Sequence, residues 1–291
     1  MNMEIKPIAY FRSPFPGKFG IPRQAGLAPA LRGRIVFEPA FRSADALRGL
    51  EGFDYLWLIW EFSGNRPTSA SSTVSLRSES PEGGVAASLA GSTHATLGTV
   101  RGGTGASLSE ASGGAERSEA VEPPELAEAV AFQATVRPPR LGGNRRVGVF
   151  ASRSPFRPNP LGLSSVRLES IDYEAKGPDG KLIGPVINVL GADLMDGTPI
   201  YDIKPYIEYA DSHPGARSGF VDAEGWEPLE VEIPEDLVPD GMYRESLAQV
   251  LSLDPRPRYH DDPRKVYGMA FGGRDVRFSV DGKTLKVISI T

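Results

Sequence analysis

The chain has 291 residues, of which 40% are hydrophobic, and its 32 basic and 37 acidic side chains give a formal net charge of −5. This is the composition of a globular protein that can bury one large or two small cores. The absence of cysteine excludes disulfides, thiolate metal sites, iron–sulfur clusters and cysteine nucleophiles. The three histidines, His94, His213 and His260, are not spaced as metal ligands, so we expect neither a metal site nor a histidine-centred triad.

Targeting and nucleotide-binding motifs are missing from the sequence. The start, MNMEIKPIAY, lacks the apolar core of a signal peptide, and the densest apolar run, LWLIW at 56–60, is too short to span a bilayer. We therefore expect a cytoplasmic protein without membrane contact. No GxxxxGK[ST] loop is present, and VINVLGADLMDG at 186–197 spaces its glycines too widely for the phosphate turn of a Rossmann fold.

Residues 1–65 and 132–211 are predicted to be mainly β. Short runs of β-branched and aromatic residues alternate with Pro, Gly and Asn loops, a pattern that favours a closed or nearly closed antiparallel barrel. YLWLIWEF at 55–62 is apolar on both faces, which predicts a fully buried central strand, and ADALRGLEG at 44–52 predicts the one helix of this part. The other expected strands are EIKPIAYF, GRIVFEP, FQATV, RVGVFAS, LSSVRLESIDYE and LIGPVINVL.

Residues 66–131 differ in kind from the rest of the chain. They contain no aromatic residue and no isoleucine, and Ser, Gly, Ala, Thr and Glu dominate. Such a segment cannot bury enough apolar surface to offset its ordering entropy, so we interpret it as a disordered, low-complexity insertion rather than a small domain. It carries eight glutamates and four arginines, and the remaining chain is therefore nearly neutral.

Residues 212–291 predict a second, smaller α+β unit. WEPLEVEIP predicts a strand, and KVYGMAFGGRDVRFSVDGKTLKVISIT predicts a terminal hairpin or meander. MYRESLAQVLSL at 242–253 predicts a helix, because Tyr243, Leu247, Val250 and Leu251 fall on one face. Pro255 and Pro257 end this helix and stiffen the loop that follows.

An arginine-rich stretch, RPPRLGGNRRVGVFASRSPFRPNP, occupies residues 137–160. It carries six arginines without an acidic residue, and guanidinium groups suit carboxylates and phosphates. Single arginines are often structural, but the set favours a site for an anionic ligand or an RNA backbone. The tetrapeptide RSPF occurs at 12–15 and again at 153–156, which suggests that two similar loops line one mouth of a barrel.

Two further loops could carry chemistry. GADLMDGTPIYD at 191–202 places Asp193, Asp196 and Asp202 in a loop after an apolar strand, where they could bind ribose hydroxyls or lie near a sulfonium. Ordinary turn chemistry explains the same residues equally well. DPRPRYH at 254–260 could position a substrate and stack a base on Tyr259, although a helix-capping linker has the same composition.

These motifs, in this order, resemble the TrmO (TsaA-like) tRNA methyltransferases. The resemblance rests on FRSPFPGKFGIPRQAGL, LRGLEGFDYLWLIWEF, TVRPPRLGGNRRVGVFASRSPFRPNPLGLS, GADLMDGTPIYDIKPY and DPRPRY, and covers about residues 4–65 and 132–291. It implies a compact β-barrel methyltransferase domain with a small α+β C-terminal domain, forming a homodimer. It also implies an enzyme that uses S-adenosylmethionine to methylate N6 of threonylcarbamoyladenosine at position 37 of threonine tRNAs.

The resemblance also implies the roles of individual residues. Asp254, Arg256 and Tyr259 of DPRPRY would be catalytic, and Arg137, Arg140, Arg145, Arg146 and Arg157 would meet RNA or the partner subunit. Two alternatives remain open: a methyltransferase of the same fold with a small-molecule or other RNA substrate, and a catalytically silent RNA-binding module. The cofactor contacts would be Gln24, Ser63, Gly64, Arg153, Leu163, Asp193, Leu194, Met195 and Asp196.

Overall fold

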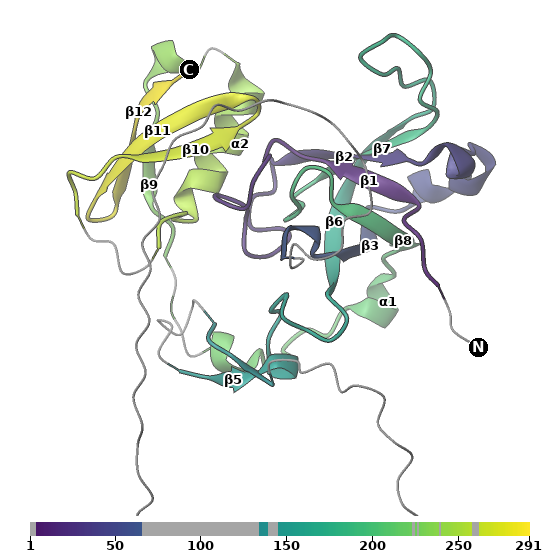
Figure 1. Ribbon diagram of the computed structural model, residues 1–291, viewed down its shortest axis with the longest axis horizontal. Coiled ribbons are helices and arrows are strands. Elements are labelled where there is room, and N and C mark those ends of the chain that lie inside the picture. The colour runs from purple at the N-terminus through teal and green to yellow at the C-terminus, as the bar shows by residue number, and fades with distance from the viewer. Residues whose placement is uncertain are drawn as a thin grey trace, which may run out of the picture. The chain divides into compact units, whose positions relative to one another are not determined.

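Antiparallel β-strands dominate the protein, as seen in a computed structural model (Figure 1). The mainly β class expected from the sequence is therefore confirmed. No helix of the described part is long and apolar enough to cross a membrane. The predicted insertion at 66–131 lies outside the described part. The structure describes residues 4–65, 134–138, 145–222, 225, 227–238, 240–257 and 262–291.

Six strands form a closed barrel in which each strand pairs antiparallel with two neighbours. Their order around the barrel is β1-β2-β7-β6-β3-β8, and β8 closes it by pairing with β1. A separate two-stranded hairpin of β4 (Thr135–Val136) and β5 (Val147–Gly148) precedes β6. The barrel strands are β1 (Ala9–Arg12), β2 (Arg32–Phe37), β3 (Tyr55–Glu61), β6 (Leu161–Asp172), β7 (Val186–Leu190) and β8 (Pro199–Pro205).

The barrel core follows from the period of two along its strands. In β3, Leu56, Leu58 and Trp60 are buried at alternate positions. The intervening residues are only half-buried or exposed, except for Glu61 at the end, so the expectation of a strand buried on both faces was wrong. A barrel of this size has an interior that side chains fill, which explains the alternation. The side chains packed inside include Phe11, Ile35, Val166, Ile187, Val189, Leu194 and Ile200.

Two other expectations for this part were wrong. Residues 44–52 do not form one helix but two 3₁₀ turns, Asp45–Leu47 and Leu50–Gly52, because Gly49 between them has a φ of 87°. The segment after Gly197 is not loop but strand β8, so Asp202 lies in the barrel wall and pairs with Lys204 at 2.9 Å. The other 3₁₀ helices are Pro39–Phe41, Ser63–Asn65, Val149–Ala151, Gly219–Val221 and Glu235–Leu237.

The C-terminal part contains a four-stranded sheet with the order β10-β11-β12-β9. Its strands are β9 (Glu230–Glu232), β10 (Tyr267–Phe271), β11 (Arg274–Asp281) and β12 (Thr284–Ile290), and β9 runs parallel to β12. Helix α2 (Gly241–Ser252) begins at Asp240, whose carboxylate accepts a hydrogen bond from the Met242 amide at 3.0 Å. The predicted helix face is buried through Leu247, Val250 and Leu251. A short helix, α1 (Glu208–Asp211), follows β8.

The loop between β1 and β2, residues 13–31, is held by this C-terminal part. Phe15, Ala28 and Leu31 belong to the same core cluster as α2 and the sheet. Phe15 is fully buried and packs edge-on against Phe271, with 5.2 Å between ring centroids. The Pro14 carbonyl accepts a hydrogen bond from the Gly272 amide at 2.8 Å. The β1–β2 loop is therefore anchored by side chains and backbone of a distant part of the sequence.

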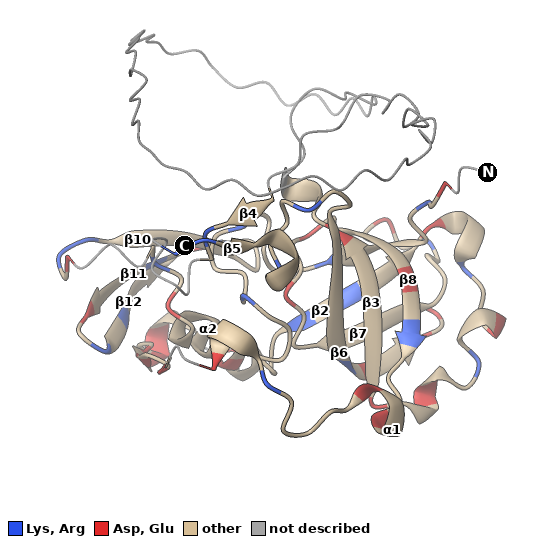
Figure 2. Cartoon of the chain, turned by 90° about the horizontal axis from the view of Figure 1, so that it is seen from below, with Lys and Arg blue, Asp and Glu red and all other residues tan. Residues whose placement is uncertain are grey.

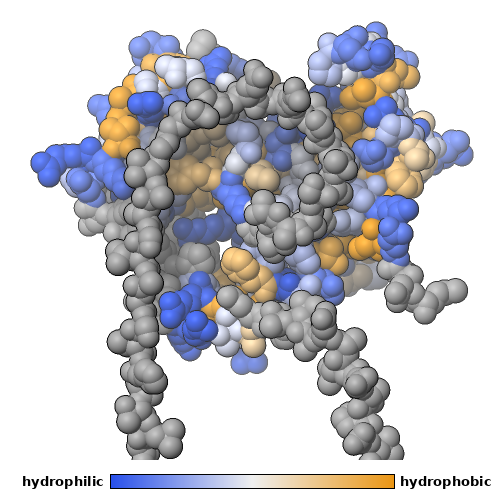
Figure 3. Space-filling view, viewed as in Figure 1, coloured by the Kyte–Doolittle hydropathy of each residue, from blue (hydrophilic) through white to orange (hydrophobic). Residues whose placement is uncertain are grey.

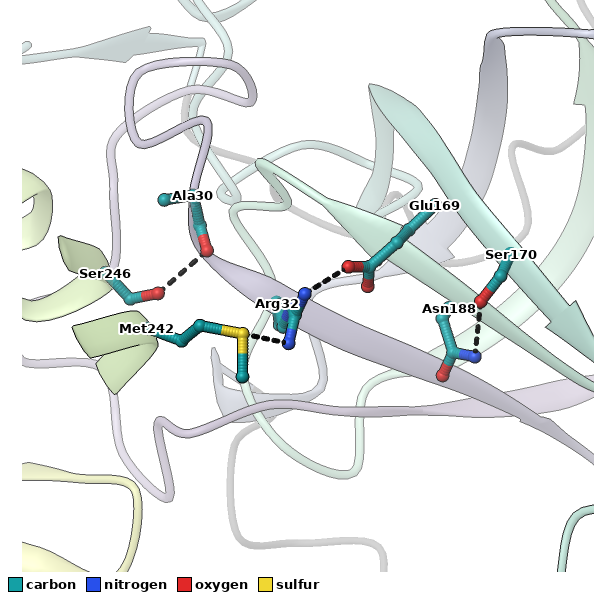
Figure 4. Close-up of polar contacts among 7 residues, drawn as sticks. All are labelled: Ala30, Arg32, Glu169, Ser170, Asn188, Met242 and Ser246. Atoms are coloured by element: carbon teal, nitrogen blue, oxygen red, sulfur yellow. Dashed lines mark hydrogen bonds and ion pairs between the residues drawn. The ribbon is translucent and has the colours of Figure 1, made fainter. Parts of the chain in front are cut away.

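Helix α2 adds polar contacts to the same loop (Figure 4). The Ser246 hydroxyl donates to the Ala30 carbonyl at 2.7 Å. The Ala30 amide donates to the Gln249 side-chain oxygen, also at 2.7 Å. At the start of β2, the Arg32 guanidinium contacts the Met242 sulfur at 2.8 Å and the Glu169 carboxylate at 2.5 Å. Helix α2 is therefore held against the β1–β2 loop and the start of β2 by polar contacts as well as by apolar packing.

Candidate active site

A cavity of 470 Å³ opens where several barrel loops meet. Its volume falls within the range of sites that enclose small ligands. Four segments supply its walls: the β1–β2 loop through residues 18–24, the end of β3 with residues 62–64, the stretch 152–163, and residues 193–198. Both loops that contain RSPF thus line the cavity. The first does so through residues that follow its tetrapeptide, and the second does so through Arg153 and Pro155 of the tetrapeptide itself.

Gln24 and Arg153 meet across the mouth of the cavity. The Arg153 guanidinium donates a hydrogen bond to the Gln24 side-chain oxygen, although 129 positions separate the two residues. Gln24 comes from the β1–β2 loop and Arg153 from the second RSPF segment. Arg153 is solvent-exposed, so its other donors can meet an anion without displacing a buried partner.

A chain of hydrogen bonds runs from the barrel interior to Asp193 in the cavity. The indole of buried Trp60 donates to the Ser164 hydroxyl at 3.0 Å, and that hydroxyl donates to the Asp193 carboxylate at 2.6 Å. Burial raises the pKa of Asp193 above its usual range, against the opposing effects of the Ser164 hydrogen bond and the Arg153 charge. The cavity therefore contains a fixed carboxyl group that is more readily protonated than a surface aspartate.

Gly162 shapes the wall beside this chain. A Cβ atom at Gly162 would lie 2.3 Å from the Trp60 ring, closer than any real contact. Trp60 and Gly162 are direct partners in the β3–β6 pairing, so the indole lies over the glycine. The glycine is needed for close packing, and it allows Trp60 to reach Ser164 and line the cavity.

Sequence reasoning missed Glu61 at the cavity. Glu61 ends β3, is only 7% exposed, and accepts a hydrogen bond from the Tyr201 hydroxyl. A signal was present, since an acidic residue directly follows the apolar run LWLIW, and buried carboxylates are rare unless they have partners. Ser164 was missed as well, although it is a polar residue at an inward position of β6. Lys18 and Arg23 are further lining residues that the motifs did not single out.

The cavity brings together most of the residues expected to contact a cofactor. Leu194 and Asp196 are not among those that line it. Leu194 is buried in the barrel core, while Asp196 accepts a hydrogen bond from the Ser13 amide at 3.0 Å and pairs with Arg12 at 3.6 Å. The expected residues that do line the cavity are Gln24, Ser63, Gly64, Arg153, Leu163, Asp193 and Met195.

The residues of DPRPRY within the described part do not line this cavity. Asp254 and Arg256 instead form a two-pronged ion pair, with nitrogen–oxygen distances of 2.8 and 3.0 Å. The Arg256 side chain is only 10% exposed, and Asp254 has a left-handed backbone with a φ of 50°. This pair fixes the path of the chain as it leaves α2. Tyr259 lies outside the described residues.

The arginines expected to meet RNA are placed in different ways. Arg137 and Arg146 line a second, larger groove beside the cavity, and Arg145 is exposed. Arg157 lines the first cavity, lies over the Phe150 ring at 5.7 Å, and donates to the Ser152 carbonyl at 2.7 Å. These contacts give Arg157 a bracing role within the loop. Arg140 lies outside the described residues.

Both parts of the chain match known family models. Residues 10–99 and 122–212 match the tRNA-methyltransferase O N-terminal domain, and residues 233–291 match the TrmO C-terminal domain. The chain belongs to the TrmO family. The TrmO resemblance expected from the motifs is thereby confirmed.

Several TrmO relatives align over nearly the whole chain. The tRNA (adenine(37)-N6)-methyltransferase of Escherichia coli K12 is 29% identical over 300 residues, covering 99% of this chain and 98% of the relative. A putative S-adenosylmethionine-dependent methyltransferase of Pseudomonas aeruginosa, RcsF, is 34% identical, with 96% and 93% covered. The crystal structure of TrmO from Pseudomonas aeruginosa superposes with a TM-score of 0.61 at 27% identity, covering 100% of this chain and 99% of that one.

Proposed function

We propose that this TrmO family protein transfers a methyl group from S-adenosylmethionine to N6 of adenine 37 in tRNA. The observation that carries the proposal is the 470 Å³ cavity in which Gln24, Arg153 and Asp193 meet from three separate loops. The names of relatives support it: the Escherichia coli protein is a tRNA (adenine(37)-N6)-methyltransferase, and the Pseudomonas aeruginosa relative is named S-adenosylmethionine-dependent.

The donor set of the cavity fits S-adenosylmethionine. That molecule carries a carboxylate, a positive sulfonium, ribose hydroxyls and a flat adenine. Arg153 offers a fork of donors for the carboxylate, and Asp193 offers an acceptor for a hydroxyl or a neighbour for the positive charge. Leu163, which is 56% exposed, and Met195 offer apolar surface for the adenine. Gln24 and the residues Ser63 and Gly64 complete the polar contacts.

Methyl transfer depends mainly on how the methyl donor and the acceptor nitrogen are positioned. S-adenosylmethionine, when bound, supplies an activated methyl group on a positively charged sulfur. The residues of the chain hold the two reactants in line, and such alignment can supply a large part of the rate. The N6–methyl bond forms as the sulfur–methyl bond breaks, the sulfur leaves as a neutral thioether, and the N6 proton is released to water. Arg153 and Gln24 fix one end of the site through their mutual hydrogen bond. Asp193 is fixed by Ser164, which is itself fixed by Trp60.

We assign the finer features of the enzyme in the same proposal. The barrel, residues 1–65 and 132–211, is the methyltransferase domain, and residues 212–291 form the small α+β C-terminal domain. The substrate is threonylcarbamoyladenosine of threonine tRNAs, the enzyme is a cytoplasmic homodimer, and no metal takes part. The matching of separate N- and C-terminal family models supports the division into two domains.

DPRPRY completes the active site in this proposal. The Asp254–Arg256 pair is nearly buried on its arginine side, so it acts by holding the motif in shape. Tyr259 is then the member of the motif that meets the substrate base, since an aromatic ring stacks on an unpaired nucleotide. Asp254, Arg256 and Tyr259 are proposed as one functional unit, and the RNA contacts as Arg137, Arg140, Arg145, Arg146 and Arg157.

Calorimetric titration and a transfer assay with labelled S-adenosylmethionine test this function. Arg153→Ala is expected to weaken cofactor binding by about 1.5–3 kcal/mol, the range for hydrogen bonds to charged groups. Arg48→Ala, at an exposed arginine that does not line the cavity, serves as the matched control. The wild-type protein should transfer label to tRNA. Absence of cofactor binding by the wild type would contradict the proposal.

A further inference from the structure

A second groove, of 1180 Å³, lies beside the cofactor cavity and shares Gln24 and Arg153 with it. Its walls come from the β1–β2 loop, the β4–β5 hairpin, the second RSPF segment and residues 217–221. Among the described residues that line it, none is acidic. Figure 2 shows basic residues (blue) close to β5, and the lower part of Figure 3 shows apolar groups beside hydrophilic ones there. Its arginines are Arg23, Arg137, Arg146, Arg153 and Arg217.

Large apolar rings are exposed in this basic groove. Phe150 is 69% exposed and Phe156 is 57% exposed, and Phe220 lines the same groove. Exposed aromatic rings next to guanidinium groups suit unpaired nucleotides, because the ring stacks on a base while the arginine meets the phosphate. A small anionic ligand would not need several rings spread over a space of this size.

The two RSPF segments show that the exposure of Phe156 is not imposed by its local structure. In both segments the serine hydroxyl oxygen accepts a hydrogen bond from the phenylalanine amide, at 3.2 Å for Ser13 and Phe15 and at 3.3 Å for Ser154 and Phe156. The same turn therefore presents both rings. Phe15 is fully buried in the C-terminal core, whereas Phe156 stays in solvent at the groove. Phe15 stabilises the fold through its burial, whereas the exposed Phe156 has no such structural role.

Phe150 is held in a defined position for the same role. It lies in the 3₁₀ helix Val149–Ala151, with the Arg157 guanidinium over its ring at 5.7 Å. Arg157 is fixed in turn by its hydrogen bond to the Ser152 carbonyl. Prolines at 155, 158 and 160 restrict this loop before anything binds. Ordering the loop on binding therefore costs little entropy.

We propose that this groove holds unpaired nucleotides of the RNA substrate, with Phe150 and Phe156 as stacking surfaces for bases and Arg23, Arg137, Arg146 and Arg217 as phosphate contacts, while Arg153 serves the cofactor. The inference rests on the proposed function, which supplies RNA as the substrate, and it adds the residues that recognise single-stranded nucleotides. Because the groove adjoins the cofactor cavity through Arg153 and Gln24, nucleotides bound there flank the base that enters the cavity.

Binding measured without cofactor tests the inference separately from catalysis. The probes are a hairpin RNA with the anticodon loop of a threonine tRNA, a fully paired duplex of the same length, and heparin as a polyanion without bases. Phe150→Leu and Phe156→Leu are expected to weaken hairpin binding roughly 5- to 150-fold each, the range for loss of one stacked base. Binding of heparin should be unchanged. Phe41→Leu, at a 45% exposed ring that lines neither pocket, is the matched control.

The arginines have a different expected signature. Arg146→Gln and Arg217→Gln should weaken hairpin and heparin alike, and each should reduce the log–log salt slope of hairpin binding by about 0.7, the value for a single-strand phosphate contact. Arg48→Gln is the control. Wild-type hairpin affinity in both phenylalanine variants would overturn the inference, as would equal wild-type affinity for hairpin and duplex. If stacking behaves as expected but no methyl transfer occurs, the proposed function fails while the nucleotide groove stands.

Discussion

Anchoring of the β1–β2 loop by the C-terminal core leads to a prediction about cofactor binding. Phe15→Ala removes a fully buried ring that packs on Phe271, and large-to-small changes of this kind cost about 3–5 kcal/mol of unfolding free energy. The same loop carries Gln24 into the cavity. If Gln24 is no longer correctly placed, the binding free energy of S-adenosylmethionine should fall by the value of about one hydrogen bond, 0.5–1.5 kcal/mol. This corresponds to a roughly 2- to 10-fold weaker affinity.

Urea denaturation and calorimetric titration measure the two effects. Phe19→Ala, in the same loop but 39% exposed, is the control and should change both quantities little. If Phe15→Ala does not fold, Gln249→Ala provides a milder version, because it removes the hydrogen bond to the Ala30 amide and, besides that, a long exposed one of 3.4 Å to Glu245. Gln249→Ala should lower the free energy of unfolding by about 0.5–1.5 kcal/mol and should also weaken cofactor binding. A folded Phe15→Ala or Gln249→Ala protein with full cofactor affinity would refute the coupling between this anchor and the cavity.

Four further outcomes are expected. Gly162→Ala forces the Trp60 ring to move and should cost about 1–3 kcal/mol in urea denaturation, whereas Gly148→Ala, where a Cβ meets nothing within 4 Å, should cost less. Ser164→Ala removes a hydrogen bond that lowers the pKa of Asp193, so the pKa of Asp193 should rise further. Because the ionised carboxylate is the form that binds the cofactor, calorimetric titrations at falling pH should show the variant losing cofactor affinity at a higher pH than the wild type. Asp254→Asn weakens the ion pair that holds DPRPRY in shape, so it should slow single-turnover transfer. Cofactor affinity should stay unchanged, because neither Asp254 nor Arg256 lines the cofactor cavity, and loss of cofactor binding would contradict this. Replacing residues 66–131 with a short Gly/Ser linker should leave calorimetric cofactor affinity intact, and a weaker affinity would show that the segment supports the fold.

The strands of the fold were predictable where the hydrophobic period was clear. β3 and the meander β10–β12 fall within the expected segments, β2 and β6 overlap theirs but begin one and two residues earlier, and the apolar face of α2 is buried as expected. Strand β8 was missed because Asp-Gly-Thr-Pro, which runs into its first residue, Pro199, is typical of a turn. The burial of this short strand comes from closure of the barrel, which no local pattern shows. The single helix over 44–52 failed at Gly49, where a left-handed backbone conformation divides it into two turns.

The site was predictable where a residue type announces its chemistry, and not where tertiary contact creates it. Arg153 and Asp193 stood out as an arginine and an acid in loops, and both line the cavity. Ser164 and Trp60 gain their roles only through the β3–β6 pairing, which no local pattern reveals. The opposite burial of Phe15 and Phe156 likewise depends on what each identical turn faces, not on the shared letters RSPF.

Methyl transfer to N6 of threonylcarbamoyladenosine at position 37 of tRNA can be measured on the product itself. The most direct measurement incubates the full chain with S-adenosylmethionine and threonine tRNA that carries the threonylcarbamoyl group, then digests the tRNA and analyses its nucleosides by mass spectrometry. We expect a nucleoside heavier by one methyl group, in an amount that Arg153→Ala lowers and Arg48→Ala does not. Unchanged threonylcarbamoyladenosine, in a preparation that binds both S-adenosylmethionine and the tRNA, would contradict it.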